Sequence, residues 1–273
     1  MKNLLISAIA AMAVSAAAGE EVYVSPITGQ PFREGGEYTL EQIKARDERV
    51  LKKTGGFVEA EAKGVSVLVL DTRLKPGGAA LQFEDVFSSL SKTNVKVERK
   101  PLEPGESALD KAASMLGSEK AAYAIAIIED DARRGLAVYP EDRLAVVNAA
   151  RYRGGDDPLR PEVRVHKEIW RALGFMAGIG YAPFENDVMQ PVFSIGELDA
   201  QQYQVMQPMN FQKMYATLKN FGVTRARRVP YRLACKEGWA PAPTNEYQKA
   251  IWDEFHQLPT KPVTIEYDPK RGM

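Results

Sequence analysis

The feature that most constrains the fold is an uncharged eight-residue segment, Ala121–Ile128, near the middle of the chain. Its sequence, Ala-Ala-Tyr-Ala-Ile-Ala-Ile-Ile, places apolar side chains on both faces that a strand would present. A strand of this kind is typical of the centre of a parallel sheet, where both faces are covered by helices. The segment therefore predicts a central strand of an α/β sheet.

The segments on either side alternate between strand and helix patterns. The expected strands cover residues 65–70, 95–98, 136–139 and 144–147, and the expected helices cover residues 81–90 and 106–116. A strand–helix–strand–helix–strand order implies a right-handed α/β sheet with mostly parallel strands. The first half of the chain thus predicts one sheet with packed helices.

The remaining segments are mainly helical. Near the N-terminus, residues 39–53 predict a charged helix, with Thr39 as N-cap and Gln42 at the capping-box position. In the second half a helix is expected to begin near Pro161, because proline fits the first turn of a helix. Further expected elements are helices at 198–205, 211–218 and 245–255 and a short strand at 263–267.

The most informative stretch is residues 167–177, Lys-Glu-Ile-Trp-Arg-Ala-Leu-Gly-Phe-Met-Ala. Its frame resembles the extended zinc motif of the metzincin peptidases, H-E-x-x-H-x-x-G-x-x-H. In that motif two histidines four residues apart reach one metal from one helix face, and the glutamate acts as general base on the metal-bound water. The glycine ends the helix, so that the chain can turn back with a third ligand. Glu168 and Gly174 occupy the glutamate and glycine positions.

Two further stretches extend the resemblance. Residues 186–191, Asn-Asp-Val-Met-Gln-Pro, resemble the metzincin Met-turn, with Met189 twelve residues beyond Ala177. Residues 144–153 are similar to the edge strand and linker that precede the zinc helix in archaemetzincins. The resemblance covers roughly residues 65–222. It implies a metzincin-like fold, with a twisted and mostly parallel sheet, packed helices and then a mainly helical C-terminal part.

The chain departs from the motif at all three zinc-ligand positions, which hold Lys167, Arg171 and Ala177. Zinc sites use about three deprotonated protein ligands, whereas lysine and arginine are cations at neutral pH and would repel a divalent ion. We therefore expect no zinc and no other cofactor. His166 is one residue early, and a helix turns about 100° per residue, so this histidine points away from the Arg171 face. A packing or surface role is favoured for it over a ligand role.

Two interpretations of these side chains remain open. In one, Lys167 and Arg171 lie on a solvated helix face, with Glu168 as an incidental partner. In the other, the two cations line a cleft in place of the metal, together with Ala177 and Met189, and can hold a carboxylate or another anion. Glu168 is the candidate catalytic residue, expected to be vestigial. Met189 is expected to pack in the core, whatever its ancestry.

Composition and the N-terminus indicate the class of protein and its compartment. Lysine plus arginine and aspartate plus glutamate both number 36, so no basic excess favours a nucleic-acid partner. Residues 1–18 read as a signal peptide, since residues 4–14 form an apolar run too short for a membrane anchor and small residues follow. We expect an exported protein, periplasmic or extracellular, without a membrane span. Cys235 is the only cysteine, so no internal disulfide is expected, and a packed thiol is favoured over a nucleophile. For the same reason the cysteine-bound structural zinc that archaemetzincins carry is not expected.

The sequence divides into a signal peptide (1–18), an N-terminal extension with one helix (19–60), a metzincin-like domain (61–235) and a C-terminal extension (236–273). The leading hypothesis is an exported, catalytically inactive metallopeptidase homologue that binds a peptide or protein. One alternative is an enzyme with metal-independent hydrolytic chemistry around Glu168. Another is a structural envelope protein. An open pocket at Lys167 and Arg171 would favour binding or catalysis, and a filled one would favour the structural role.

Overall fold

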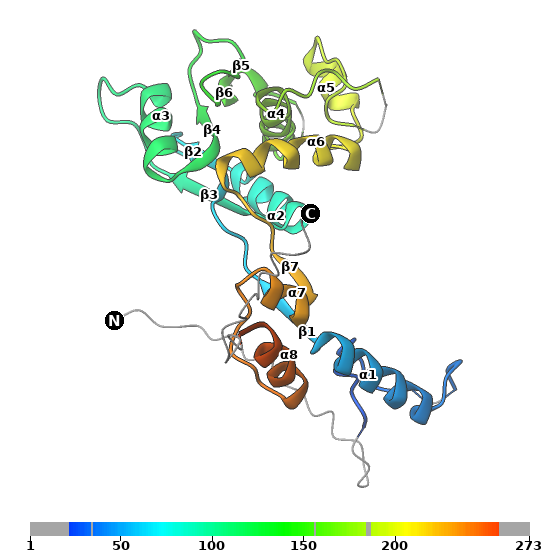
Figure 1. Ribbon diagram of the computed structural model, residues 1–273. Helices are drawn as coiled ribbons and strands as arrows, with labels where there is room; N and C mark the ends of the chain where they lie inside the picture. The colour runs from blue at the N-terminus through cyan, green and yellow to red at the C-terminus, as the bar shows by residue number, and fades with distance from the viewer. Residues whose placement is uncertain (1–21, 34, 156, 184–186, 257–273) are drawn as a thin grey trace, which may run out of the picture. The chain divides into compact units, whose positions relative to one another are not determined.

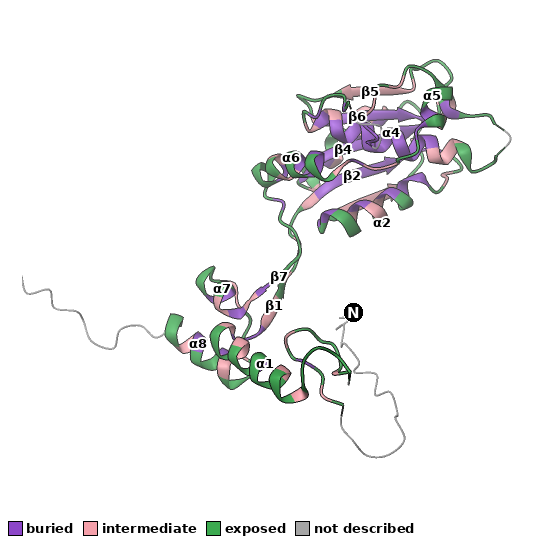
Figure 2. Cartoon of the chain, turned by 90° about the vertical axis from the view of Figure 1, so that its right-hand side faces the viewer, coloured by how far each residue is buried: buried purple, intermediate pink, exposed green. Residues whose placement is uncertain are grey.

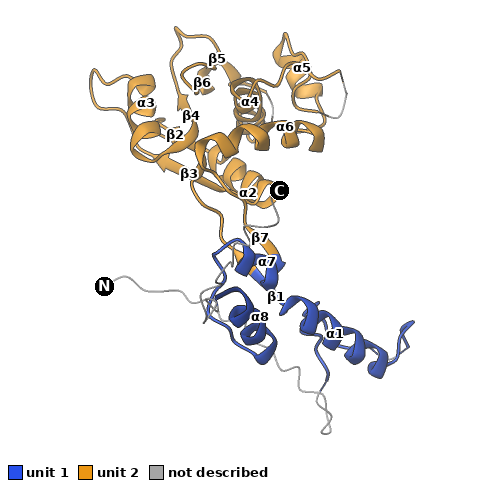
Figure 3. Cartoon of the chain, in the orientation of Figure 1, with its two compact units in different colours: residues 1–58, 229–273 blue, residues 59–228 orange. Residues whose placement is uncertain are grey.

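The computed structural model describes residues 22–33, 35–155, 157–183 and 187–256. The chain divides into two compact units, coloured separately in Figure 3. Unit 1 contains residues 1–58 and 229–273, and unit 2 contains residues 59–228. The two boundaries fall within β1 (Phe57–Ala60) and β7 (Arg227–Pro230), which pair in a two-stranded sheet. Unit 1 therefore contains most of both predicted extensions, and the predicted signal peptide lies outside the described residues.

Unit 2 is built on a five-stranded sheet with the strand order β3-β2-β4-β6-β5 (Figure 1). The strands are β2 (Val65–Asp71), β3 (Asn94–Arg99), β4 (Ala121–Ile128), β5 (Leu136–Tyr139) and β6 (Leu144–Asn148). The pairs β2–β3, β2–β4 and β4–β6 are parallel, and only β5 is antiparallel to its neighbour β6. The predicted α/β class with a mostly parallel sheet is confirmed.

Helices cover both faces of this sheet, because every residue of β4 is buried and each face needs an apolar cover. On one face α3 (Ala108–Ser118) packs through Ala112 and Leu116. On the other face α2 (Ala79–Ser91) and α4 (Arg160–Met176) form the larger core with α6 (Pro208–Leu218). Figure 2 shows buried residues along β2, β4 and α4. Short 3-10 turns, η1 (Ala149–Tyr152) and η2 (Lys219–Phe221), follow β6 and α6.

The segment after α4 corrects one predicted helix. A helix was expected over residues 198–205, whereas α5 covers Ile195–Ala200. It begins earlier because the Ser194 side chain caps it by accepting from the Glu197 amide. It ends earlier because Gln201 adopts an extended backbone and donates through Nε2 to the carbonyl oxygens of Asp187 and Val188. The chain after α5 is therefore held by the turn before it.

Unit 1 contains α1 (Leu40–Thr54), α7 (Tyr231–Lys236) and α8 (Glu246–His256). The predicted caps of α1 are confirmed, with a capping box at Thr39 and a left-handed Gly55 after its last turn. Its one buried side chain is Asp47, which accepts hydrogen bonds from Tyr23 and Arg46. Cys235 is buried, and burial raises the pKa of its thiol. Elements β1, β7 and α7 were not predicted, and the strand expected at 263–267 lies outside the described residues.

Candidate functional site

Helix α4 carries the motif and lies in the core of unit 2. Pro161 occupies its first turn, as predicted, and the helix then runs for 17 residues. All residues from Arg164 to Gly174 are buried, including the polar residues His166, Lys167, Glu168 and Arg171. The interpretation of Lys167 and Arg171 as a solvated helix face is therefore wrong, because they are only 3% and 4% exposed.

Three cations spaced i, i+3 and i+7 form a stripe along α4, namely Arg164, Lys167 and Arg171. The Arg164 guanidinium holds both carboxylate oxygens of Asp199, at 2.7 and 2.6 Å. These bonds anchor the N-terminal half of α4 to α5.

The other two cations of the stripe bind backbone carbonyls. The Lys167 ammonium donates to the carbonyl oxygens of Leu198 at 2.7 Å and Gln201 at 2.6 Å. The Arg171 Nη1 donates to those of Val188 at 3.1 Å and Gln190 at 2.5 Å. Each head group thus has well-placed acceptors, which offset the cost of burying a charge. The stripe fastens the whole segment 188–201 onto α4.

Glu168 lies beside this stripe with few polar partners. Its carboxylate is 3.3 Å from Nε of Arg171, a contact close enough for an ion pair but too poorly aligned for a hydrogen bond. Burial raises the pKa of Glu168, although the charge of Arg171 acts in the opposite direction. Burial also raises the pKa of the nearby Tyr152, and the Glu168 carboxylate adds to that effect. A buried carboxyl with a raised pKa is the one feature here that fits acid–base chemistry.

His166 is a packed residue, as predicted. It is 1% exposed, and its Nε2 accepts a hydrogen bond from Nε1 of Trp170 at 3.1 Å. This bond requires an unprotonated Nε2, so the imidazole is neutral in the folded protein. Burial lowers the pKa of His166 to about 4, and the neighbouring Lys167 lowers it further. Its ring contacts Trp170 rather than the face that carries the stripe.

Gly174 has a different role from the predicted one. It was expected to end the helix, but α4 continues to Met176, Ala177 is its C-cap, and Gly178 makes the left-handed turn. A Cβ at position 174 would collide with the sulfur of Met189. Glycine is therefore needed for close approach of the turn that holds Met189. The prediction that Met189 packs in the core fits its full burial.

The Met189 turn is organised by Asp187, which the sequence analysis did not single out. This fully buried carboxylate accepts from the Met189 amide at 2.8 Å, the Gln207 amide at 3.0 Å and Nδ2 of Asn210 at 2.6 Å. The amide bond two residues on is an Asx-turn, which an aspartate just before a buried Val-Met pair could have suggested. Asp187 thus joins the turn to α6.

The residues at the former ligand positions do not fit zinc. Both Lys167 and Arg171 are hydrogen-bond donors without a free lone pair in their charged forms, and both point at carbonyl oxygens. Ala177 has no donor atom and packs against the core. Within the ranges that the structure describes, no three His, Cys, Asp or Glu side chains come together to hold a metal ion. We therefore derive no step through a metal.

The predicted cleft lined by Lys167, Arg171 and Met189 also needs correction. These side chains are buried, and both cations already bind carbonyls, so they do not face an open space that could take an anion. The hollow nearest to them lies outside the turn, between Tyr181–Pro183 and Gln190–Pro191, with a volume of about 750 Å³. The stripe supports this hollow from behind, since Arg171 binds the carbonyl of Gln190.

Among the described residues, no helix is long and apolar enough to cross a membrane. No family model and no curated protein matches the sequence.

Three solved structures are similar to this chain. An archaemetzincin from Methanopyrus kandleri has 21% sequence identity and a TM-score of 0.45, covering 57% of this chain and 96% of its own. A zinc-dependent peptidase from Methanocorpusculum labreanum has 15% identity and a TM-score of 0.43, covering 54% and 98%. An archaemetzincin from Archaeoglobus fulgidus has 14% identity and a TM-score of 0.39, covering 55% and 99%.

Proposed function

We propose that this chain is an exported, non-catalytic homologue of the archaemetzincin-type zinc peptidases and that it binds an extended peptide. The observation that carries the non-catalytic part is the stripe on α4. The positions that match the first two zinc ligands hold Lys167 and Arg171, and both head groups bind carbonyls of the turn that contains Met189. A cation pair in this arrangement replaces a metal centre by a structural link.

Support for peptide binding comes from the free edge of β5. Among the described residues β5 pairs with β6 alone, so one side of β5 has unpaired backbone groups. The other edge strand, β3, is protected by charge, because Lys96 forms ion pairs with Glu98 and Glu119. No residue of β5 is charged. An exposed, uncharged edge is suited to the addition of a peptide strand.

The ladder geometry of β5 shows which groups a peptide would meet. The Asn148 amide donates to the Gly135 carbonyl at 2.7 Å. Because hydrogen-bonded pairs alternate along an antiparallel ladder, the amides of Leu136 and Val138 point away from β6. The hollow beside Tyr181 gives side chains of a bound peptide a second place to pack.

The test uses the full mature chain and labelled ten-residue peptides rich in valine and threonine. We expect saturable binding by fluorescence anisotropy and no cleavage by mass spectrometry, with zinc well below one equivalent by elemental analysis. Peptides with proline at alternate positions lack the required amides and should not bind. Val138→Pro should abolish binding, whereas Val97→Pro on the protected edge should leave it intact, provided that both variants keep the melting temperature of the parent.

The outcomes separate the alternatives. Stoichiometric zinc or chelator-sensitive cleavage would contradict the non-catalytic assignment. Cleavage without metal that disappears in Glu168→Gln would establish the enzyme alternative, which the raised pKa of Glu168 favours. Absence of binding and cleavage would leave the structural envelope role, which the filled positions around Lys167 and Arg171 favour.

A further inference from the structure

The sheet of unit 2 has a topological switch point between β2 and β4. From β2 the chain passes through α2 to β3 on one side, and from β3 it returns through α3 to β4 on the other side. Helices α2 and α3 lie on opposite faces of the sheet. In open α/β sheets, ligands bind in the crevice outside the carboxyl ends of the strands at such a point.

A cavity of about 370 Å³ lies at this place. Its lining comes from the residues that directly follow β2 and β4 and from the first turn of α3. The apolar part of the lining includes Leu74, Leu102 and Ile128, of which Leu74 is 84% exposed. The volume falls in the range of about 300–1,000 Å³ that small-molecule pockets occupy.

One wall of the cavity is fixed by a buried amide. Asn148, at the end of β6, is fully buried, and its Nδ2 donates to the carbonyls of Asp130 at 2.6 Å and Arg133 at 3.1 Å. Its Oδ1 accepts from the Asp130 amide at 3.0 Å. These three bonds fix the loop after β4, which carries the charged side of the cavity.

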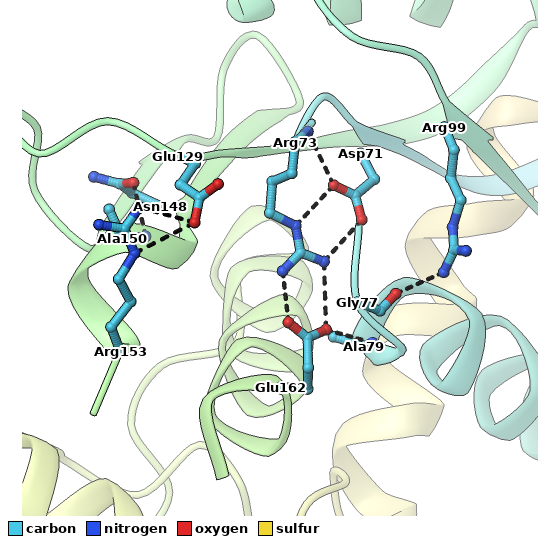
Figure 4. Close-up of polar contacts among 10 residues, drawn as sticks. All are labelled: Asp71, Arg73, Gly77, Ala79, Arg99, Glu129, Asn148, Ala150, Arg153 and Glu162. Carbon is cyan, nitrogen blue, oxygen red and sulfur yellow. Dashed lines mark hydrogen bonds and ion pairs between the residues drawn. The ribbon is translucent and has the colours of Figure 1, made fainter. Parts of the chain in front are cut away.

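The opposite wall is equally constrained. Figure 4 shows the Arg73 guanidinium enclosed by the carboxylates of Asp71 and Glu162. Glu162 also accepts from the Ala79 amide at the start of α2. A cavity with fixed walls loses little conformational entropy when a ligand binds.

The charges of the lining define the ligand. Arg73 is neutralised by its two carboxylates and adds no free charge. The loop after β4 presents both signs, with the carboxylates of Glu129 and Asp130 and the guanidinium of Arg133. A ligand with one sign of charge would meet repulsion from one of these groups. A ligand with an ammonium and a carboxylate complements both.

We propose that this switch-point cavity binds a short zwitterionic peptide, a dipeptide with apolar side chains. Its ammonium lies at Asp130 and Glu129, its carboxylate lies at Arg133, and its side chains pack on Leu74 and Ile128. This site is separate from the stripe on α4 and from the edge of β5, so it does not depend on the proposed peptide-strand binding.

Isothermal titration calorimetry of the full mature chain with L-leucyl-L-leucine tests the proposal. The two controls are N-acetyl-leucyl-leucine, which lacks the ammonium, and leucyl-leucine amide, which lacks the carboxylate. We expect the unmodified dipeptide to bind and each blocked form to bind at least tenfold more weakly, because each loses one charged contact.

Variants of the two half-exposed charged residues assign the ends of the ligand. Asp130→Asn should weaken the dipeptide about tenfold and leave the N-acetyl form unaffected, since that form has no ammonium to lose. Arg133→Gln should weaken the dipeptide and leave the amide unaffected. Glu141→Gln, in the exposed turn between β5 and β6, is the matched control and should change nothing. Equal binding of the blocked and unmodified forms, or no heat from the dipeptide up to its solubility limit, would overturn the proposal.

Discussion

Two buried cations in unit 2 have opposite kinds of partner. Lys167 is enclosed by neutral carbonyl oxygens, whereas Arg73 is enclosed by two carboxylates. The first arrangement leaves a net positive charge in the core and the second a net negative one. The difference teaches that burial alone does not determine how a charge responds to change. What remains after a cation is removed, a dipole or an ion, determines the cost.

The two arrangements also hold different parts of the molecule. The stripe of Arg164, Lys167 and Arg171 fixes one segment, residues 188–201, onto one helix. The Arg73 cluster joins the end of β2 to the first turn of α4 through Glu162, and Glu162 in turn caps α2. Loss of the stripe should therefore loosen one segment. Loss of the Arg73 cluster should disturb the packing of two helices at the carboxyl edge of the sheet.

The largest expected effect is that of Arg73→Met. It leaves the fully buried Asp71 and the half-buried Glu162 as uncompensated carboxylates, which costs about 3–5 kcal/mol when a buried ion pair loses one partner. Native-state hydrogen exchange of β4 amides measures the free energy of unfolding of unit 2. A loss below about 1 kcal/mol would show that water reaches this cluster and screens it.

Lys96→Met is the matched control for that experiment. Lys96 also lies between two carboxylates, Glu98 and Glu119, at 2.9 and 2.6 Å, but this group is partly exposed on β3. Solvent can rehydrate both carboxylates there, so the change in stability should be close to the error of the measurement. The contrast between the two variants isolates burial from the number of ion pairs.

An acid titration distinguishes the two regions without a change at either cation. The pKa of His166 is lowered by burial to about 4, below the usual value of 6.5, so its contribution to stability is present above pH 6.5 and is lost as pH falls toward 4. Between pH 7 and pH 5 this amounts to about 2 kcal/mol. The pKa of Glu162 is also lowered from 4.5, by the hydrogen bonds from Arg73 and Ala79 in spite of burial, so the Arg73 cluster loses stability only at more acidic pH.

His166→Gln is the variant that checks this assignment. A glutamine does not titrate, so the loss between pH 7 and pH 5 should disappear while the loss below pH 4.5 remains. Urea denaturation followed by circular dichroism at each pH gives the comparison. Persistence of the first loss in the variant would assign it to another group.

The sequence predicted the strands, the sheet class and the motif frame because these depend on local patterns. The uncharged run Ala121–Ile128 can be stable only when covered on both faces, and Thr39 and Gln42 form a local capping box. The environment of Lys167 was not predictable, because its acceptors lie 31 and 34 residues further along the chain. Gly174 was assigned to a helix end, since its contact with Met189 is equally non-local.

The smallest expected effect is that of Lys167→Met, which tests the other side of the comparison. Methionine has nearly the length of lysine, so the cavity stays filled, and only the ammonium and its two hydrogen bonds are lost. The carbonyls of Leu198 and Gln201 then lack a donor, which costs stability, but the protein no longer buries a charge, which restores some of it. Because neutral groups remain instead of ions, we expect a net loss of about 1 kcal/mol by hydrogen exchange of β4 amides. The amides of residues 195–201 should lose protection more than those of β4, since the stripe holds that segment. A loss as large as that of Arg73→Met, or equal loss of protection throughout unit 2, would show that carbonyl and carboxylate partners are equivalent in this core.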